Sequence, residues 1–354
     1  MTLPLRYPVR VAAVTHIETE EALEEILSRP SSADVEAMRS MEGDLLILGV
    51  GGKMGPSLAA LARRACGQAG VQKRIIGVAR FSDQGLRGRL EAAGIETIAC
   101  DLLDRKALEA LPDCPNVLFM AGQKFGTTGD QALTWAMNAH LPALVAERYR
   151  ASRIVAFSSA NVYPFVAVGS GGCREQDAVG PVGEYAQSVL GRERIFEHFS
   201  LRNRTPMVLL RLSYAVELRY GVLRDVAEKV LARQPIDLTT GHASIIWQGD
   251  ANSIALRSFR HCSVPPLVLN VSGPEIVSIR SVAQKMGDAC GTDPVFSGTE
   301  SETALLENTT RCWEMFGGPG VSLDHMIAWI ARWVGKGGRG LGKPTHYETR
   351  DGRF

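Results

Sequence analysis

The sequence predicts an α/β fold with a doubly wound parallel sheet and a smaller C-terminal α/β lobe. Short apolar runs such as 45–48 end at glycine or polar residues, which is typical of strands buried on both faces. A helical pattern follows most of these runs. This repeated alternation predicts parallel strands joined by right-handed crossovers.

The expected elements follow one another along the chain. Two short helices are expected at 19–30 and 34–41, after a possible short strand at 9–16. Apolar runs then predict strands at 45–48, 74–81, 95–104, 114–124, 153–163, 207–216 and 268–273. Helical patterns predict helices at 56–66, 85–94, 130–150, 184–199, 278–291 and 321–334.

The chain of 354 residues is long enough for about two domains. We expect an N-terminal extension over 1–43, the larger sheet domain over 44–210, and a smaller lobe, interleaved with it, mostly over 211–334. Residues 335–354 are rich in glycine and basic residues, so we expect a flexible, solvated tail. The polar and aromatic end of this tail leaves docking on a neighbouring surface, or over the site, as the alternative.

Composition is that of an ordinary globular enzyme, with 45% hydrophobic residues, 22% charged residues and a net charge of +1. No long run of Lys and Arg indicates a nucleic-acid or membrane partner. The seven cysteines are scattered without a C-x-x-C pair, so neither a metal site nor a disulfide framework is expected. We see no signal peptide and no spanning segment, and therefore expect a cytoplasmic protein.

The turn after the first strand has the spacing of a dinucleotide cradle. Its glycines, Gly49, Gly52 and Gly55, follow a G-x-x-G-x-x-G pattern, with Lys53 and Met54 between the last two. Such a turn lets the backbone approach a pyrophosphate, and the next helix directs its free N–H groups there. We therefore expect residues 44–210 to be a Rossmann domain.

Two further residues bear on the cofactor. Arg80 closes the second strand, where an arginine can pair with a ribose 2′-phosphate. It favours NADP, with NAD as the alternative. Asp101 follows the third strand and can reach an adenine amino group, with Leu102 beside it.

Together these features resemble the extended short-chain dehydrogenases/reductases, the NAD-dependent epimerase/dehydratase family. The resemblance covers roughly 44–334, because the glycine turn, Asp101, an Ala-Gly strand ending, Asn138 and SSANVY (158–163) follow the family's order and approximate spacing. It implies hydride transfer to or from a nicotinamide. It also implies further cofactor contacts from Ala121, Gly122, Asn138 and Ser158, and substrate contacts from Asn161, Arg211 and Ser213.

The resemblance also supplies a catalytic pair. Ser159 matches the family's substrate-orienting Ser or Thr, with Ser158 as the alternative. Tyr185, 26 residues later, matches its general acid/base. Four residues beyond that tyrosine the family has a lysine, which binds the nicotinamide ribose and lowers the tyrosine pKa. Val189 stands there instead.

Three interpretations of Val189 remain open. Lys124, in a stretch resembling the A-G-x-K of UDP-galactose epimerases, can substitute for the lysine. Alternatively, the tyrosine works slowly with an unshifted pKa, or the protein is a non-catalytic NAD(P) sensor of the same fold. Arg192 lies on the same helix face as Tyr185 but two turns away, so we expect it to be too distant for a simple replacement.

The substrate is expected to be a sugar-like small molecule. Only 39 residues separate Arg211 from Asp250, which resembles another family position, and this favours a free sugar, sugar acid or lactone over a nucleotide sugar. A nucleotide-sugar epimerase is the second alternative. Ala160 and Asn161 stand where the family's dehydratases have Asp-Glu, which argues against dehydration. A homodimer is expected because the family pairs the helices at 130–150 and 184–199.

Overall fold

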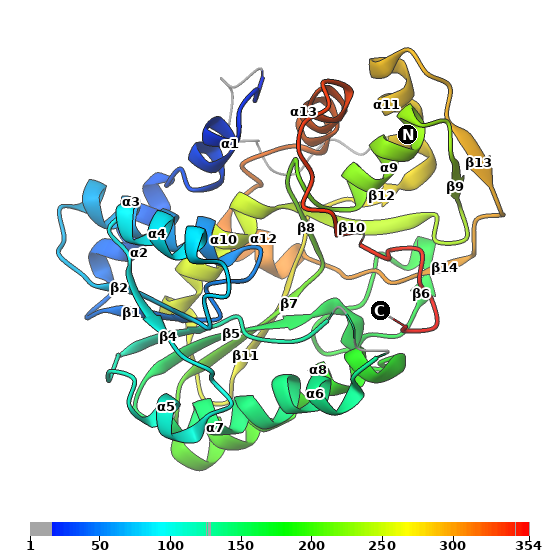
Figure 1. Cartoon of the computed structure of the whole chain (residues 1–354). Helices are drawn as coiled ribbons and strands as arrows, with labels where there is room; N and C mark the ends of the chain where they lie inside the picture. The colour runs from blue at the N-terminus through cyan, green and yellow to red at the C-terminus, as the bar shows by residue number, and fades with distance from the viewer. Residues whose placement is uncertain (1–15, 125, 127–128, 344, 354) are drawn as a thin grey trace.

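The structure is a computed structural model that describes residues 16–124, 126, 129–343 and 345–353. Apart from His16, the strand predicted at 9–16 lies outside the described residues. The predicted doubly wound α/β fold is confirmed, with a smaller lobe above one edge of the main sheet (Figure 1).

Seven parallel strands form the main sheet, in the order β11-β7-β5-β4-β1-β2-β3. The apolar residues of β1, β4 and most of β5 are buried on both faces, which is why these runs lack the alternation of a half-exposed strand. The strands are β1 (Leu45–Leu48), β2 (Ile75–Ala79), β3 (Glu96–Ala99), β4 (Asn116–Phe119), β5 (Arg153–Ser159), β7 (Met207–Leu212) and β11 (Leu267–Val271).

Helices cover both faces of this sheet (Figure 1). One layer contains α2 (Ser32–Ser40), α3 (Gly55–Ala69), α4 (Gln84–Ala92), α10 (Gln248–Arg257) and α12 (Thr310–Phe316). The other contains α5 (Arg105–Glu109), α6 (Gln131–Trp135), α7 (Leu141–Arg148) and α8 (Gly183–Asn203). Each layer shares a separate apolar core with the sheet.

The smaller lobe has its own core. Its sheet contains β8 (Tyr214–Val216), β10 (His242–Trp247) and β12 (Ile276–Ser278). Its helices are α9 (Val222–Leu231), α11 (Ile279–Cys290) and α13 (Leu323–Gly335), and α1 (Glu20–Leu27) packs into the same core. Two short strand pairs lie at the periphery: β9 (Pro235–Asp237) with β13 (Val295–Ser297), and β6 (Val166–Ala167) with β14 (Thr303–Ala304).

The strand predicted over 207–216 is divided at Ser213. Its first part, β7, belongs to the main sheet, and its second part, β8, pairs with β10 in the small sheet. The Ser213 N–H still donates to the carbonyl of Val271 at 3.1 Å, after which the chain leaves the main sheet. One apolar run therefore crosses between the two lobes.

The helix predicted over 130–150 is interrupted by a π-helical turn, Ala136–His140, between α6 and α7. In this turn Leu141 N–H donates to the carbonyl of Ala136, five residues back. Pro142 follows, and it has no N–H to offer the carbonyl of Asn138. Asn138 is fully buried at the centre of the interruption.

The expected flexible tail is instead docked on the protein. The Thr345 hydroxyl donates to Asp225 at 2.5 Å, and the side chain of Tyr347 is 1% exposed. Arg350 donates to the carbonyl of Thr303 at 2.9 Å. The prediction of a solvated tail was wrong because the contacts of these side chains offset the entropy lost when the glycine-rich segment is ordered. Figure 1 shows the tail in red, descending from α13 toward β6.

Within the described ranges, every helix falls short of the length and apolar character needed to cross a bilayer. All seven cysteines are free thiols.

Candidate active site

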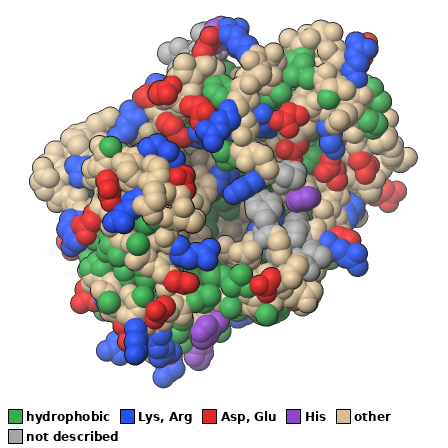
Figure 2. All heavy atoms as spheres, in the orientation of Figure 1, with side chains coloured by type: hydrophobic (Ala, Val, Ile, Leu, Met, Phe, Trp, Pro, Cys, Tyr) green, Lys and Arg blue, Asp and Glu red, His purple; other side chains and the backbone are tan. Residues whose placement is uncertain are grey.

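A cavity of about 1660 Å³ lies between the carboxyl ends of the main-sheet strands and the smaller lobe. Figure 2 shows this hollow with Lys and Arg side chains around it. Its size exceeds the roughly 300–1,000 Å³ of a usual ligand pocket, so a dinucleotide and a second small molecule can occupy it together. Open α/β sheets generally bind ligands at this edge.

The glycine turn forms one end of the cavity. Gly49 has φ +92°, and a Cβ atom there would lie 2.7 Å from the backbone nitrogen of Ala121. At Gly55 a Cβ atom would lie 2.2 Å from the carbonyl oxygen of Val50. No side chain caps the start of α3, so the N–H groups of its first turn other than Pro56, which has none, are available to a diphosphate. These residues therefore fit a dinucleotide.

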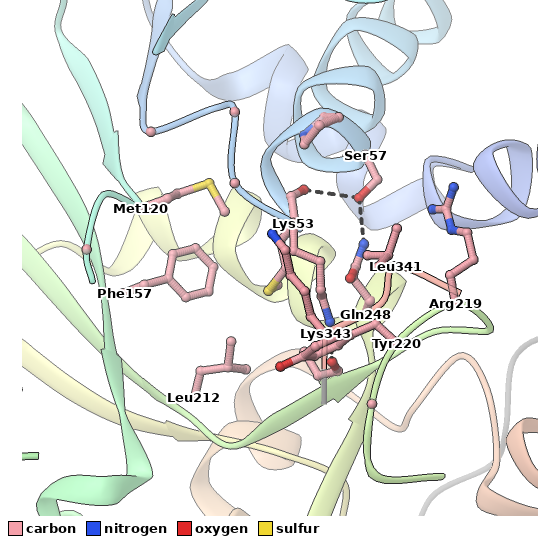
Figure 3. Close-up of a pocket in the computed structure, with 18 of the residues that line it drawn as sticks. Lys53, Ser57, Met120, Phe157, Leu212, Arg219, Tyr220, Gln248, Leu341 and Lys343 are labelled. Carbon is pink, nitrogen blue, oxygen red and sulfur yellow. Dashed lines mark hydrogen bonds between the residues drawn. The ribbon is translucent and has the colours of Figure 1, made fainter. Parts of the chain in front are cut away.

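Lys53 extends from this turn across the cavity. Its Nζ donates to the carbonyl of Ala215 at 2.5 Å and lies 4.2 Å from the ring centroid of Tyr220 (Figure 3). Burial lowers the pKa of Lys53 to about 7. The side chain therefore joins the cofactor end of the cavity to the smaller lobe.

Tyr185 and Ser159 meet at the other end of the cavity. The Ser159 hydroxyl acts on Tyr185 and donates to Oδ1 of Asn161 at 2.9 Å. Burial raises the pKa of Tyr185, while the charge of Arg192 and the neighbouring Ser159 hydroxyl lower it. The structure thus brings together the predicted serine, asparagine and tyrosine.

Lys124 lies beside this group. Its Nζ is 5.7 Å from the ring centroids of both Tyr185 and Tyr214, and burial lowers its pKa to about 8. The predicted lysine is therefore close to the predicted tyrosine.

The family's lysine position is filled by apolar packing. Val189 is 1% exposed and packs in a cluster with Ala160 and Val162. Arg192, which the sequence predicted to be too distant, lines the cavity and acts electrostatically on Tyr185.

Twelve of the predicted site residues line the cavity and six lie outside its lining. The twelve are Gly49, Gly52, Lys53, Met54, Gly122, Lys124, Asn138, Ser158, Ser159, Asn161, Tyr185 and Ser213. The six, all in the described part of the chain, are Gly55, Arg80, Asp101, Leu102, Ala121 and Arg211. Arg80 is exposed just beyond β2.

Arg211 belongs to a buried network under the site. Its guanidinium binds Glu193 through two hydrogen bonds of 2.9 and 2.7 Å, and it donates to the Tyr163 hydroxyl at 2.7 Å. The Ser158 hydroxyl donates to the same Glu193 at 2.5 Å. Ser158 therefore couples the cavity wall to this ion pair.

Several lining residues were missed from the sequence. They are Asp83, Tyr214, Arg219, Tyr220, Arg339, Leu341 and Lys343. Asp83 follows β2, Tyr214 begins β8, Arg219 and Tyr220 follow β8, and the last three belong to the tail. The polar and aromatic composition of the tail's end was the signal for docking, whereas nothing local indicated the division at Ser213.

A sequence profile described as "NAD dependent epimerase/dehydratase family" matches residues 45–260, more than half of the chain. The chain belongs to this family, which confirms the predicted enzyme class and an NAD-type cofactor. Among curated proteins, none matched the sequence.

Solved epimerase structures share the fold at low identity. An epimerase from Methanothermobacter thermautotrophicus has a TM-score of 0.70 and 16% identity, covering 86% of this chain and 96% of its own. UDP-glucuronic acid 4-epimerase from Bacillus cereus has a TM-score of 0.67 and 16% identity. UDP-glucose 4-epimerase from Thermotoga maritima has a TM-score of 0.68 and 15% identity. Each of these two matches covers 83% of this chain and 99% of the epimerase chain.

Proposed function

We propose that this chain transfers hydride between NAD(P) and a hydroxyl or carbonyl group of a sugar-like small molecule, as an oxidoreductase or an epimerase. The observation that carries this proposal is that Ser159 and Tyr185 line the same cavity as the glycine turn, where Ser159 acts on Tyr185. A protein that only bound a dinucleotide would not need this pair.

Each residue has a defined role. A bound nicotinamide accepts or returns the hydride. Ser159 and Asn161 hold the reacting substrate oxygen, and the Tyr185 phenolate accepts its proton during oxidation. Lys124 would bind the nicotinamide ribose or the substrate. In the reverse direction Tyr185 returns the proton.

For the cofactor we propose NADP, with NAD as the alternative. Arg80 is exposed immediately after β2, just outside the cavity lining, where an arginine can pair with a 2′-phosphate. The turn at Gly49, Gly52, Lys53 and Met54 would hold the diphosphate. Gly122, Asn138 and Ser158 would border the nicotinamide half.

For the substrate we propose a sugar acid. The substrate end of the cavity contains Lys124 and Lys343, whereas the lining carboxylates lie on α1 and at Asp83. Arg219 is already paired with Glu217 and Glu20. A carboxylate on the substrate would offset the remaining positive charge. A nucleotide-sugar epimerase is the alternative, since one similar structure contains UDP-glucuronic acid and NAD.

Titration with NAD and NADP, followed by an oxidation screen of sugars and sugar acids at the nicotinamide absorbance, tests the proposal. We expect tighter binding of NADP and reduction of cofactor by at least one sugar acid. Binding without turnover of any sugar, sugar acid, lactone or nucleotide sugar would contradict it.

Such a result would favour the second candidate, a non-catalytic NAD(P) sensor. Val189 in the lysine position is the observation that supports a sensor. The two functions differ in their dependence on Tyr185, which a sensor does not need.

The oligomeric state and the cellular location also remain proposals. Leu133 and Trp135 on α6 are each more than a third exposed, which supports a homodimer through this helix and α8. A cytoplasmic location also remains a proposal.

A further inference from the structure

The guanidinium of Arg192 is held rigidly beside the cavity. The side chain is 6% exposed, and Nη1 donates to the carbonyl of Phe157 at 2.7 Å. Nη2 donates to Oδ1 of Asn138 at 2.7 Å, and Nε lies 3.5 Å from the Asn138 carbonyl. The ring of Phe119 lies 5.4 Å away. A solvated surface arginine would have none of this support.

The π-helical turn contributes to this support. In a regular helix the residue four positions after Asn138 would donate to its carbonyl, but that residue is Pro142. The carbonyl is therefore available to Nε of Arg192. π-Turns inside helices are frequent at functional sites.

Gly122 supplies the space for the guanidinium. A Cβ atom at this position would lie 2.4 Å from Nη2 of Arg192 and 3.0 Å from Oδ1 of Asn138. Any larger residue would therefore displace the charged group or its partner. In this chain a glycine is therefore required at position 122 to leave space for Arg192, independently of any contact with the cofactor.

Helix geometry directs Arg192 toward Tyr185. Seven residues correspond to about two turns and roughly 10 Å of rise along α8. Side chains on a helix lean toward its N-terminus, so Arg192 leans toward the turn that carries Tyr185. Val189 lies between them and packs in an apolar cluster.

We propose that Arg192 is the positioning residue that replaces the family's lysine: held by Phe157, Asn138 and the space at Gly122, it provides a positive charge that acts on Tyr185. This inference rests on the proposed function, in which Tyr185 exchanges a proton with the substrate. The charge stabilises the phenolate form of Tyr185 and so permits proton removal during oxidation.

Other groups in the described part of the chain also face Tyr185. Lys124 faces it from the loop after β4, Ser159 from β5, and Tyr214 and Tyr220 from the smaller lobe. Burial lowers the pKa of Lys124 to about 8, so this amine loses its charge as the pH rises.

Arg192 keeps its charge in the same range. Burial lowers its pKa only to about 10. The neighbouring Glu193 forms its ion pair with Arg211, and its charge favours the charged form of Arg192.

The titration of Tyr185 itself tests the inference without cofactor or substrate. Fluorotyrosine would be placed at position 185 and followed by fluorine NMR against pH in wild type, R192Q, R192K and K124M. R192Q keeps a hydrogen-bond donor but removes the positive charge, and we expect the pKa of the tyrosine at position 185 to rise by about one unit or more. R192K should retain most of the wild-type value, and K124M should shift it less than R192Q does.

The same variants give a second readout in the active enzyme. The pH at which kcat/KM for oxidation rises should move upward in R192Q by a similar amount and return toward wild type in R192K. A uniform loss at every pH, with an unmoved tyrosine titration, would overturn the inference and assign Arg192 a structural role.

Folding is checked by circular dichroism. If R192Q does not fold, G122A replaces it, because the added methyl group displaces the guanidinium without removing it. An unmoved titration in folded G122A would equally overturn the inference. Absence of turnover in wild type would contradict the proposed function, while the apo titration would still decide the role of Arg192.

Discussion

The two ends of the cavity follow the family pattern to different degrees. At the glycine end, Gly49 and Gly55 stand where the backbone leaves no room for a Cβ atom, so the spacing is fixed by steric contacts. At the tyrosine end, Arg192 acts on Tyr185 through its charge and Lys124 lies 5.7 Å from the tyrosine ring centroid, while the family's lysine position holds a buried valine. A residue required by backbone geometry, such as Gly49, must therefore stay at its position, whereas a positive charge can act on Tyr185 from more than one position.

Replacement of Tyr185 by Phe should have the largest effect. Loss of the acid/base group is expected to lower kcat by about 10²- to 10⁴-fold, with NAD(P) affinity changed by less than about twofold. Steady-state kinetics and a cofactor titration on the same preparations measure both quantities. Unchanged turnover would show that the tyrosine end of the cavity is not catalytic.

At the glycine end, G49A should weaken dinucleotide binding at least about tenfold and destabilise the fold by roughly 2 kcal/mol, because φ is +92° and a Cβ meets Ala121. The control is G67A in α3, where a Cβ meets no atom within 4 Å. It should stabilise by about 0.5–1 kcal/mol. Urea unfolding and cofactor titration check both, and equal behaviour of the two variants would refute the steric explanation.

The tail can be tested through Tyr347. Y347A removes a side chain that is 1% exposed in the core of the smaller lobe, and it should cost about 3–5 kcal/mol and raise KM. Y347F keeps the ring and should cost less than about 1 kcal/mol. If thermal unfolding shows no difference between these variants, the tail does not contribute to the core.

The smallest effect is expected at Lys343. K343A should raise KM about two- to fivefold for a sugar acid, leave KM for the matching neutral sugar unchanged, and preserve kcat. The difference should shrink as salt is added, because this exposed charge is screened. An equal effect on both substrates would show that Lys343 does not recognise an anion.

The sequence was most informative where backbone geometry dictates residue type. The buried strands and the glycine turn have such signatures, and Ser159 and Tyr185 follow from family spacing. Arg192 could not be assigned, because its position depends on the carbonyl freed by Pro142 and the space at Gly122. The docked tail and the division at Ser213 depend on contacts between segments far apart in sequence.

The most direct test of whether Arg192 replaces the family's lysine is to place a lysine at position 189. V189K would be introduced into R192Q, and the pH profile of kcat/KM would be compared with those of R192Q and wild type. We expect V189K/R192Q to recover most of the lost activity at neutral pH and to move the profile back toward wild type. A double variant that folds, binds NAD(P) and remains as impaired as R192Q would contradict the conclusion that Arg192 replaces the missing lysine.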